Sequence, residues 1–135
     1  MLVAIPLEFA VAQTKPSILI IENNNPTLEL YRRELGRHFK VLACSELAEA
    51  QALVKTPRLA AVVLEPEIGD GQGWNLLTEL KQIFYGNSLP VILCSTMDDR
   101  KRGLEAGAAD FLVKPVLSPV LIETIQRIIR SSSKV

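Results

Sequence analysis

Five short, continuously apolar segments occur along the chain, at residues 18–21, 41–44, 60–64, 91–94 and 111–113. None of them alternates apolar with polar residues, as a strand with one solvated face would. Continuous apolar runs of this length are typical of strands that are buried on both faces of a parallel sheet. The pattern therefore predicts five such strands.

The segments between these strands carry apolar residues at helical spacing, which predicts five helices. Pro26 suits the first turn of the first helix, and Pro57 and Gly86 end the second and the third. Gly107 suits the C-cap of a short fourth helix, and Ser118 the N-cap of the last. The stripes and segments that define the helices are Leu28, Tyr31, Leu35 and His38; Leu47, Ala50 and Val54; Leu76, Leu77, Leu80 and Phe84; residues 98–106; and Leu121, Ile125, Ile128 and Ile129.

Strands and helices thus alternate along the chain. Right-handed crossovers place the helices on both faces of one parallel sheet. Five strands favour the flavodoxin-like arrangement, a doubly wound α/β fold with strand order 2-1-3-4-5. We expect this single domain to span residues 17–131, preceded by an N-terminal arm at 1–16 and followed by a tail at 132–135.

The charge balance bears on the class of partner. The chain carries 15 Lys and Arg residues against 15 Asp and Glu residues, so its formal net charge is zero. A nucleic-acid binder generally needs surplus cations to neutralise phosphates. Aromatic residues make up 5% of the chain, which leaves few platforms for stacking bases. We therefore expect no direct contact with nucleic acid.

The N-terminus and the cysteines bear on location. Residues 1–12 are mostly apolar, but no Lys or Arg precedes them, and Pro6 and Glu8 interrupt them. Such a segment matches neither a signal peptide nor a membrane-spanning helix. Cys44 and Cys94 each end an apolar run, which favours buried, reduced thiols. We therefore expect a cytoplasmic protein without membrane contact.

Polar residues follow four of the predicted strands. Glu22 and Asn23 come directly after the first strand, Glu65 after the third and Ser95 after the fourth, and Lys114 follows the fifth. In α/β sheets, ligands bind beyond the carboxyl ends of the strands, where these side chains would meet. We therefore predict a functional or vestigial site at this edge of the sheet.

Motifs for nucleotide phosphates and for a nucleophilic serine are absent. No G-x-x-x-x-G-K-[ST] and no G-x-G-x-x-G follows the first strand, and no G-x-S-x-G occurs. Residues 70–73, Asp-Gly-Gln-Gly, are rich in glycine and predict a flexible loop before a helix that begins near Trp74.

Residues 17–130 resemble the receiver domain of two-component response regulators. Residues 18–23, Ile-Leu-Ile-Ile-Glu-Asn, resemble its first strand and acidic pair, and residues 89–95 resemble its fourth strand, which ends in a hydroxyl residue. The most specific match is 107–115, Gly-Ala-Ala-Asp-Phe-Leu-Val-Lys-Pro, with the family's lysine and the proline that often follows a cis bond. Gly73 falls where the family places a glycine after its phosphorylation loop.

The resemblance implies a CheY-like form of the fold and phosphoryl transfer to an aspartate. In the family, an acidic pair and that aspartate hold Mg²⁺, and the lysine and the hydroxyl bind the phosphoryl oxygens. The matching positions here are Glu22 and Asn23 for the acidic pair, Glu65 for the acceptor, and Ser95, Phe111 and Lys114 for the hydroxyl, aromatic and lysine residues of the switch.

Two of these positions depart from the pattern. Glu65 replaces the acceptor aspartate and is one methylene longer, and Asn23 replaces a charged member of the acidic pair. Two carboxylates in place of three attract Mg²⁺ less strongly, and misplacing a reacting group can cost about 100-fold in rate. We therefore expect a degenerate receiver, or pseudo-receiver, that is not phosphorylated, is not an enzyme and holds no metal or cofactor. The longer Glu65 is expected to reach Lys114 and partly imitate a phosphorylated aspartate.

Two alternatives stay open. One is a working, Mg²⁺-dependent phosphoacceptor that uses Glu65 or a nearby substitute such as Asp70, although Asp70 lies well past the strand end. The other is an unrelated flavodoxin-like enzyme or nucleotide binder, which fold analogy alone supports.

A protein partner is expected in phosphorelay-type signalling. We expect this partner to be a histidine kinase, a phosphotransfer protein or an output domain. Formation of a homodimer is a further alternative. The candidate contact residues are the basic side chains of the fourth and last helices: Arg100, Lys101, Arg102, Arg127 and Arg130.

Overall fold

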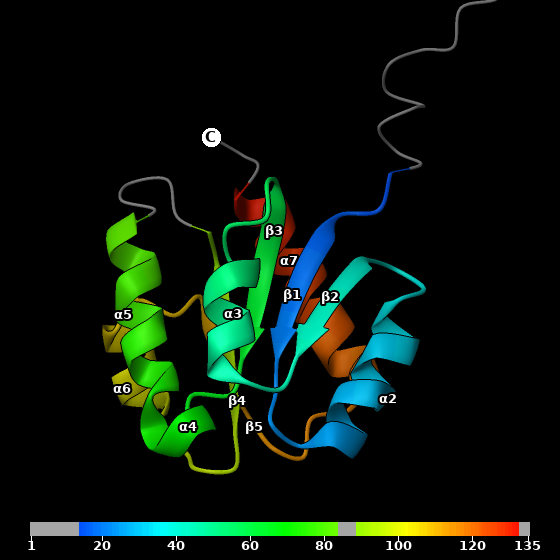
Figure 1. Cartoon of the computed structure of the whole chain (residues 1–135). Helices are drawn as coiled ribbons and strands as arrows, with labels where there is room; N and C mark the ends of the chain where they lie inside the picture. The colour runs from blue at the N-terminus through cyan, green and yellow to red at the C-terminus, as the bar shows by residue number, and fades with distance from the viewer. Residues whose placement is uncertain (1–13, 84–88, 133–135) are drawn as a thin grey trace, which may run out of the picture.

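The computed structural model describes residues 14–83 and 89–132, whose strands form one parallel sheet in the order β2-β1-β3-β4-β5 (Figure 1). This confirms the predicted fold and strand order. Each strand begins and ends within one residue of its predicted segment. The strands are β1 (Ser17–Ile21), β2 (Lys40–Cys44), β3 (Leu59–Leu64), β4 (Val91–Ser95) and β5 (Asp110–Val113).

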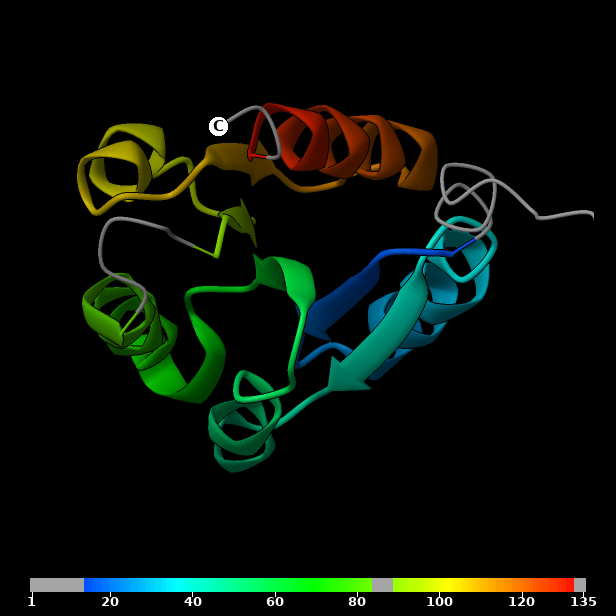
Figure 2. The same ribbon diagram turned by 90° about the horizontal axis from the view of Figure 1, so that it is seen from above.

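Helices cover both faces of the sheet, as Figure 2 shows from above. Helices α2 and α7 pack on one face, and α3, α4, α5 and α6 lie on the other. No helix in the described part of the chain is both long and apolar enough to cross a membrane. The helices are α2 (Asn25–Leu35), α3 (Leu47–Leu53), α4 (Ile68–Gly71), α5 (Gly73–Ile83), α6 (Arg100–Glu105) and α7 (Ser118–Ser132).

The central strands are apolar throughout because both of their faces are covered. Along β1, Ile18 and Ile20 pack into the cluster under α2 and α7, whereas Leu19 and Ile21 pack into the cluster on the opposite face. All four side chains are fully buried. Burial of one such side chain stabilises the fold by about 1.5–3 kcal/mol. Because alternate residues of β1 pack into opposite clusters, the sheet joins the two clusters into one structure.

The first helix begins as predicted but ends earlier. Pro26 lies in the first turn of α2, and the Asn24 side chain caps it by accepting the Thr27 N–H at 3.0 Å. His38 does not belong to the apolar stripe, because α2 ends at Leu35 and His38 follows as an exposed residue. Phe39 is the buried residue of this turn. Phe84 and Gly86, predicted to close the third helix, lie outside the described residues.

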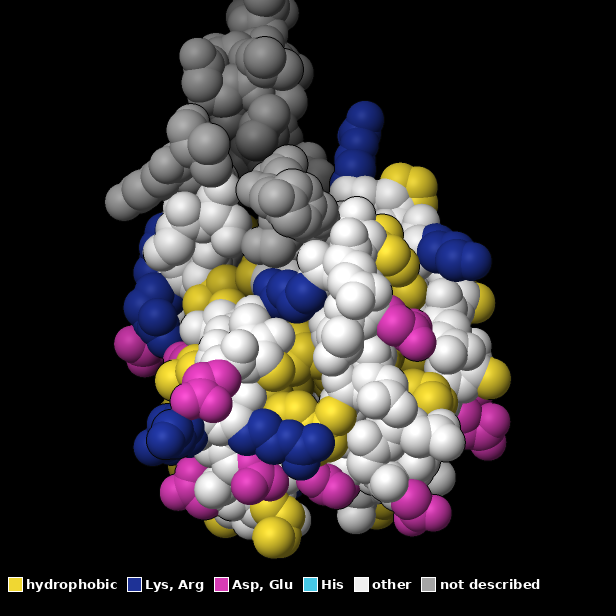
Figure 3. Space-filling view, turned by 90° about the vertical axis from the view of Figure 1, so that its left-hand side faces the viewer, with side chains coloured by type: hydrophobic (Ala, Val, Ile, Leu, Met, Phe, Trp, Pro, Cys, Tyr) yellow, Lys and Arg dark blue, Asp and Glu magenta, His cyan; other side chains and the backbone are white. Residues whose placement is uncertain are grey.

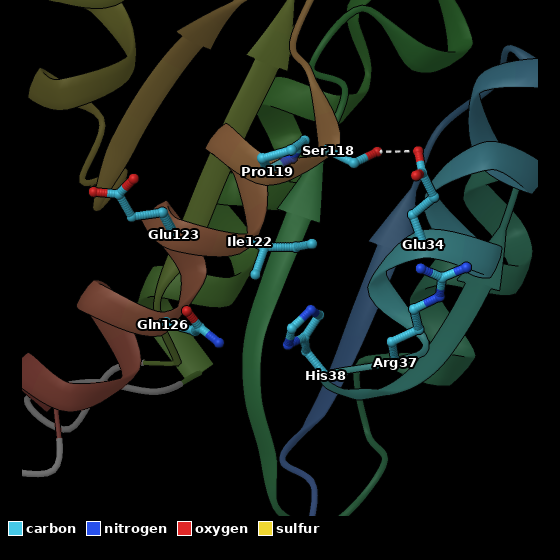
Figure 4. A pocket seen from close by; sticks show the side chains of 8 residues that line it. All are labelled: Glu34, Arg37, His38, Ser118, Pro119, Ile122, Glu123 and Gln126. Atoms are coloured by element: carbon cyan, nitrogen blue, oxygen red, sulfur yellow. Dashed lines mark hydrogen bonds between the residues drawn. The ribbon is translucent and has the colours of Figure 1, made fainter.

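Ser118 does not cap α7 as predicted. It is the first residue of the helix, and the carbonyl of Leu117 accepts the Leu121 N–H at 3.1 Å. The Ser118 hydroxyl instead donates to Glu34 Oε1 at 2.8 Å across a groove of about 330 Å³ between α2 and α7 (Figure 4). The packing of α2 against α7 supplies a carboxylate acceptor, and this contact binds the two helices together.

The segment predicted as a flexible loop, residues 70–73, has a defined structure. It contains the end of the short helix α4, with Gly69 and Asp70 in left-handed conformations at φ 62° and 56°. Helix α5 then begins at Gly73, where a Cβ would lie 2.6 Å from the Pro66 carbonyl oxygen. Only glycine fits such a close approach.

Gly107 and both cysteines behave as predicted. Gly107 follows α6 with φ 100° and donates its N–H to the Leu104 carbonyl at 3.1 Å. Cys44 and Cys94 are buried free thiols. Burial raises the pKa of Cys44 to about 11 and that of Cys94 to about 12, which keeps both protonated at neutral pH. Residues 1–13 and 133–135, most of the expected arm and tail, lie outside the described residues.

Candidate functional site

The carboxyl edge of the sheet brings together three charged side chains from three strand ends. Glu22 follows β1, Glu65 follows β3 and Lys114 follows β5, at the edge to which the strand arrows point in Figure 1. The Lys114 ammonium lies 2.6 Å from Glu22 Oε1 and 2.9 Å from Glu65 Oε1. Glu65 therefore reaches Lys114 as expected, whereas the closer contact with Glu22 was not predicted. We call these three residues the carboxylate–lysine cluster.

Backbone N–H groups bind the remaining carboxylate oxygens of the cluster. Glu22 Oε2 accepts the Asn24 N–H at 3.0 Å, and Glu65 Oε2 accepts the Glu67 N–H at 3.2 Å. All four carboxylate oxygens are thus engaged within the protein. The Glu22 and Glu65 side chains are only 3% and 7% exposed. Buried charges of this kind require hydrogen-bonding or charged partners, which these contacts supply.

The cluster keeps Lys114 charged. Burial lowers the pKa of Lys114, but hydrogen bonds and charge interactions with Glu22 and Glu65 outweigh this effect, so the net pKa is raised. Two carboxylates and one ammonium leave a single net negative charge in the pocket. The peptide bond between Lys114 and Pro115 is cis, as the resemblance implied.

The carboxylate–lysine cluster does not fit Mg²⁺ well. Asn23 is exposed and, within the described residues, its side chain makes no hydrogen bond to the cluster. In the same part of the chain, no three His, Cys, Asp or Glu side chains converge closely enough to hold a metal ion. Mg²⁺ requires near-octahedral oxygen ligands, which two carboxylates already bound to a lysine supply poorly.

Ser95 and Phe111 are both buried. The Ser95 hydroxyl accepts the Met97 N–H at 3.2 Å, so it stabilises its own loop. The Phe111 ring packs against Gly103 of α6, where a Cβ would lie 2.7 Å from the ring. Asp70, the suggested substitute acceptor, is exposed on α4 and, in the described ranges, forms no ion pair with Lys114.

Sequence reasoning missed a group of contacts around Trp74. The indole N–H donates to Glu67 Oε1 at 3.1 Å, and the Arg102 guanidinium carbon lies 3.9 Å from the centre of the Trp74 ring. No spacing rule links residues 67, 74 and 102, because a loop and two different helices carry them.

Four of the five basic residues proposed as a partner surface fall into two groups, and the fifth, Arg130, is exposed on α7. Arg102 stacks on Trp74, and Arg127 pairs with Asp110 at 2.9 Å. Arg100 and Lys101 are exposed, and no ion pair involves them within residues 14–83 and 89–132.

Comparison with known proteins identifies the family. Residues 18–126 match the family model of the response regulator receiver domain, and the chain therefore belongs to that family. It is 31% identical over 121 residues to the transcriptional regulatory protein PrrA of Mycobacterium tuberculosis, covering 87% of this chain and 51% of PrrA. It is 29% identical over 115 residues to the transcriptional regulatory protein DpiA of Escherichia coli K12, covering 82% of this chain and 51% of DpiA. The chain thus spans about half the length of these curated relatives.

Solved structures confirm the fold. The receiver domain of the Francisella response regulator 1452 superimposes with a TM-score of 0.80 at 20% identity, covering 88% of this chain and all of that one. The non-phosphorylated HemR receiver domain from Leptospira biflexa gives a TM-score of 0.75 at 27% identity, covering 85% of this chain and 94% of that one.

Proposed function

We propose that this receiver domain is a pseudo-receiver: a non-enzymatic protein-interaction module that holds one state without phosphorylation or a bound metal. The observation that carries the proposal is the position of the Lys114 ammonium between Glu22 and Glu65. A positive charge of the protein itself there offsets the pocket carboxylates that a metal ion would otherwise offset.

The same contacts oppose phosphorylation. Attack by Glu65 on a phosphoryl donor uses a lone pair of a carboxylate oxygen and would weaken the contacts that these oxygens already make, Oε1 with Lys114 and Oε2 with the Glu67 N–H. Lys114 would also have to leave two buried carboxylates before it could bind a phosphoryl oxygen, and separating a buried ion pair is costly. With Asn23 neutral, a divalent cation that could offset this cost is held weakly.

The partner in this proposal is a protein of two-component signalling: a histidine kinase, a phosphotransfer protein or a domain with an output function. PrrA and DpiA, which the chain matches over about half their length, are transcriptional regulatory proteins, which favours an output function near this module. Arg100 and Lys101 are the side chains that we assign to such a partner, since both are exposed.

Phosphorylation by a small-molecule donor tests the proposal. The wild type, Glu65→Asp, Asn23→Asp and the double variant are incubated with acetyl phosphate and Mg²⁺ and then weighed by intact mass spectrometry. We expect no phosphoryl adduct on the wild type, because both defects act together. The double variant regains three carboxylates and the shorter acceptor, and we expect it to be labelled.

Binding of Mg²⁺ is tested in the same variants through the fluorescence of Trp74, which is the only tryptophan in the chain. Millimolar Mg²⁺ should leave the fluorescence of the wild type unchanged and alter that of the double variant. Circular dichroism confirms that each variant is folded. A phosphoryl group on Glu65 of the wild type, or quenching of its Trp74 by Mg²⁺, would overturn the proposal.

A further inference from the structure

A continuous series of contacts leads from the carboxylate–lysine cluster to α6. Glu65 Oε2 accepts the Glu67 N–H at 3.2 Å, and Glu67 Oε1 in turn accepts the Trp74 indole N–H at 3.1 Å. The Trp74 ring then carries the Arg102 guanidinium on its face at 3.9 Å. This series bypasses Ser95 and Phe111, the positions at which the family resemblance places the switch.

We propose that Glu67, Trp74 and Arg102 form a relay that ties the position of α6 to the contacts of the Glu65 carboxylate. In this relay Arg102 is a positioning residue: its side chain is exposed, but its guanidinium is held on the Trp74 ring. The relay goes beyond the proposed function, because it operates whether or not Glu65 can be phosphorylated.

Trp74, in the middle of the relay, is firmly held. Trp74 is 7% exposed and belongs to the core cluster of this face. Gly73 beside it lies against the backbone carbonyls of Glu65 and Pro66, which fixes the start of α5 next to the cluster. The Glu67 carbonyl accepts the Gly71 N–H at 3.1 Å and closes the turn of α4. A change at Glu65 therefore reaches the indole through short, defined contacts.

The far end of the relay is a small element. Helix α6 has six residues and packs on the sheet where Gly103 touches Phe111 and Leu93. Figure 3 views this side of the molecule, where hydrophobic side chains lie in a hollow bordered by charged ones. A guanidinium stacked on an aromatic ring is attracted by the electrons of its face, so the Arg102 stack is a second point of attachment for α6.

The relay gives the exposed cations of α6 a defined direction. Arg100 and Lys101 precede Arg102 on the same short helix. Because Arg102 is held on Trp74, the other two side chains project from a helix of fixed orientation. The partner surface that they fit is acidic, and its contact geometry depends on the cluster through the relay.

Nuclear magnetic resonance of the full chain tests the relay. Two changes are made at the cluster: Glu65→Gln removes the charge, and Glu65→Asp keeps the charge but shortens the side chain by one methylene, which changes the geometry of the contact with the Glu67 N–H. Either change should shift the Trp74 indole resonance and the amide resonances of residues 100–105. The shifts of residues 100–105 should largely disappear when the same change is made in an Arg102→Ala background.

Arg100→Ala is the matched control, because Arg100 lies on the same helix without a contact to Trp74 within the described residues. In that background the α6 shifts should persist at full size. Trp74 fluorescence gives an independent readout: Arg102→Ala should increase quenching by acrylamide, whereas Arg100→Ala should not. Equal α6 shifts in the Arg102→Ala and wild-type backgrounds, or no α6 shifts from either Glu65 variant, would overturn the relay. Neither readout involves phosphorylation, so the relay and the pseudo-receiver proposal fail independently.

Discussion

At position 65, a glutamate side chain is long enough for one carboxylate to contact both the Lys114 ammonium and the Glu67 N–H. Lys114 also binds Glu22, so one cation offsets two buried anions. Charges that leave water lose hydration, and only paired charges recover that loss. The stability of this edge of the sheet therefore depends on Lys114 more than on any surface ion pair.

Lys114→Met tests this dependence. The substitution keeps an apolar stem of similar length but leaves Glu22 and Glu65 buried without a cation. We expect the free energy of unfolding to fall by about 3–5 kcal/mol, measured by urea denaturation. Arg127→Met is the control: its ion pair with Asp110 is half exposed, so the loss should be about 0.2–1 kcal/mol. Equal losses in the two variants would contradict the role of the cluster.

The difference in stability between the wild type and Lys114→Met should depend on pH, and the sign of this dependence follows from the pKa of Lys114. The pKa of Lys114 is raised in the folded state above the usual lysine value of about 10.4. Its stabilisation is therefore complete below that value and is lost as the pH rises through the raised folded pKa. The stability difference between the wild type and Lys114→Met should narrow in this alkaline range. A difference that does not narrow as the pH rises above about 10.4, the usual lysine pKa, would contradict the raised pKa.

At the scale of elements, α6 is positioned by its smallest residue. Gly103 allows the helix to lie directly on the Phe111 ring, which is 1% exposed. The same contact holds the aromatic ring at the position that the resemblance assigns to the switch.

Gly103→Ala separates helix propensity from packing. Alanine favours a helix over glycine by about 1 kcal/mol, but its Cβ would lie 2.7 Å from Phe111 and 3.0 Å from Leu93. We expect packing to dominate and the variant to be destabilised by about 1–3 kcal/mol in thermal or urea unfolding. Adding Phe111→Leu should recover part of the loss by relieving the contact. Lys101→Ala, at an exposed position of α6, should have little effect, and a stabilised Gly103→Ala would refute the close packing.

The helix ends show why some local predictions failed. His38 continued an apolar spacing, but Gly36 ends the helix before it and Phe39 occupies the buried place. Ser118 has the chemistry of an N-cap, but Glu34 on another helix accepts its hydroxyl proton. Local spacing and capping preferences do not include side chains that approach from elsewhere in the fold.

For the whole molecule, one sheet separates two apolar clusters and joins them. Neighbouring residues of β1 point into opposite clusters: Leu19 toward α3–α6, and Ile20 toward α2 and α7. Because each strand contributes to both clusters, loss of one cluster removes the support of the other. The domain should therefore unfold as a single cooperative unit.

Leu19→Ala and Ile20→Ala test this cooperativity as a matched pair, since both side chains are fully buried. Each should lower the free energy of unfolding by about 2–5 kcal/mol. Trp74 fluorescence reports only the cluster on the Leu19 side, whereas far-UV circular dichroism reports the whole chain. Both signals should give the same midpoint in both variants. Separate midpoints in Ile20→Ala would show that the two faces unfold independently.

The sequence by itself determined the strands, their order in the sheet and the edge at which the polar residues meet. The strands and the edge follow from local signals, since a run of apolar residues can be satisfied only by burial and parallel strands end at a common edge. The order follows from the doubly wound arrangement that five alternating strands and helices favour. The sequence also indicated that Glu65 would reach Lys114.

Only the tertiary structure decided which carboxylates form ion pairs with Lys114 and which basic side chains already contact another residue of the protein. Glu22 and Glu65 lie 43 residues apart, yet both contact Lys114, and Trp74 and Arg102 lie 28 apart, yet they stack on each other. No periodicity along the chain encodes such contacts, because they depend on how whole helices rest on the sheet. The approach of α6 to α5 thus turned Arg102 from a surface cation into a link between a helix and the cluster at the edge of the sheet.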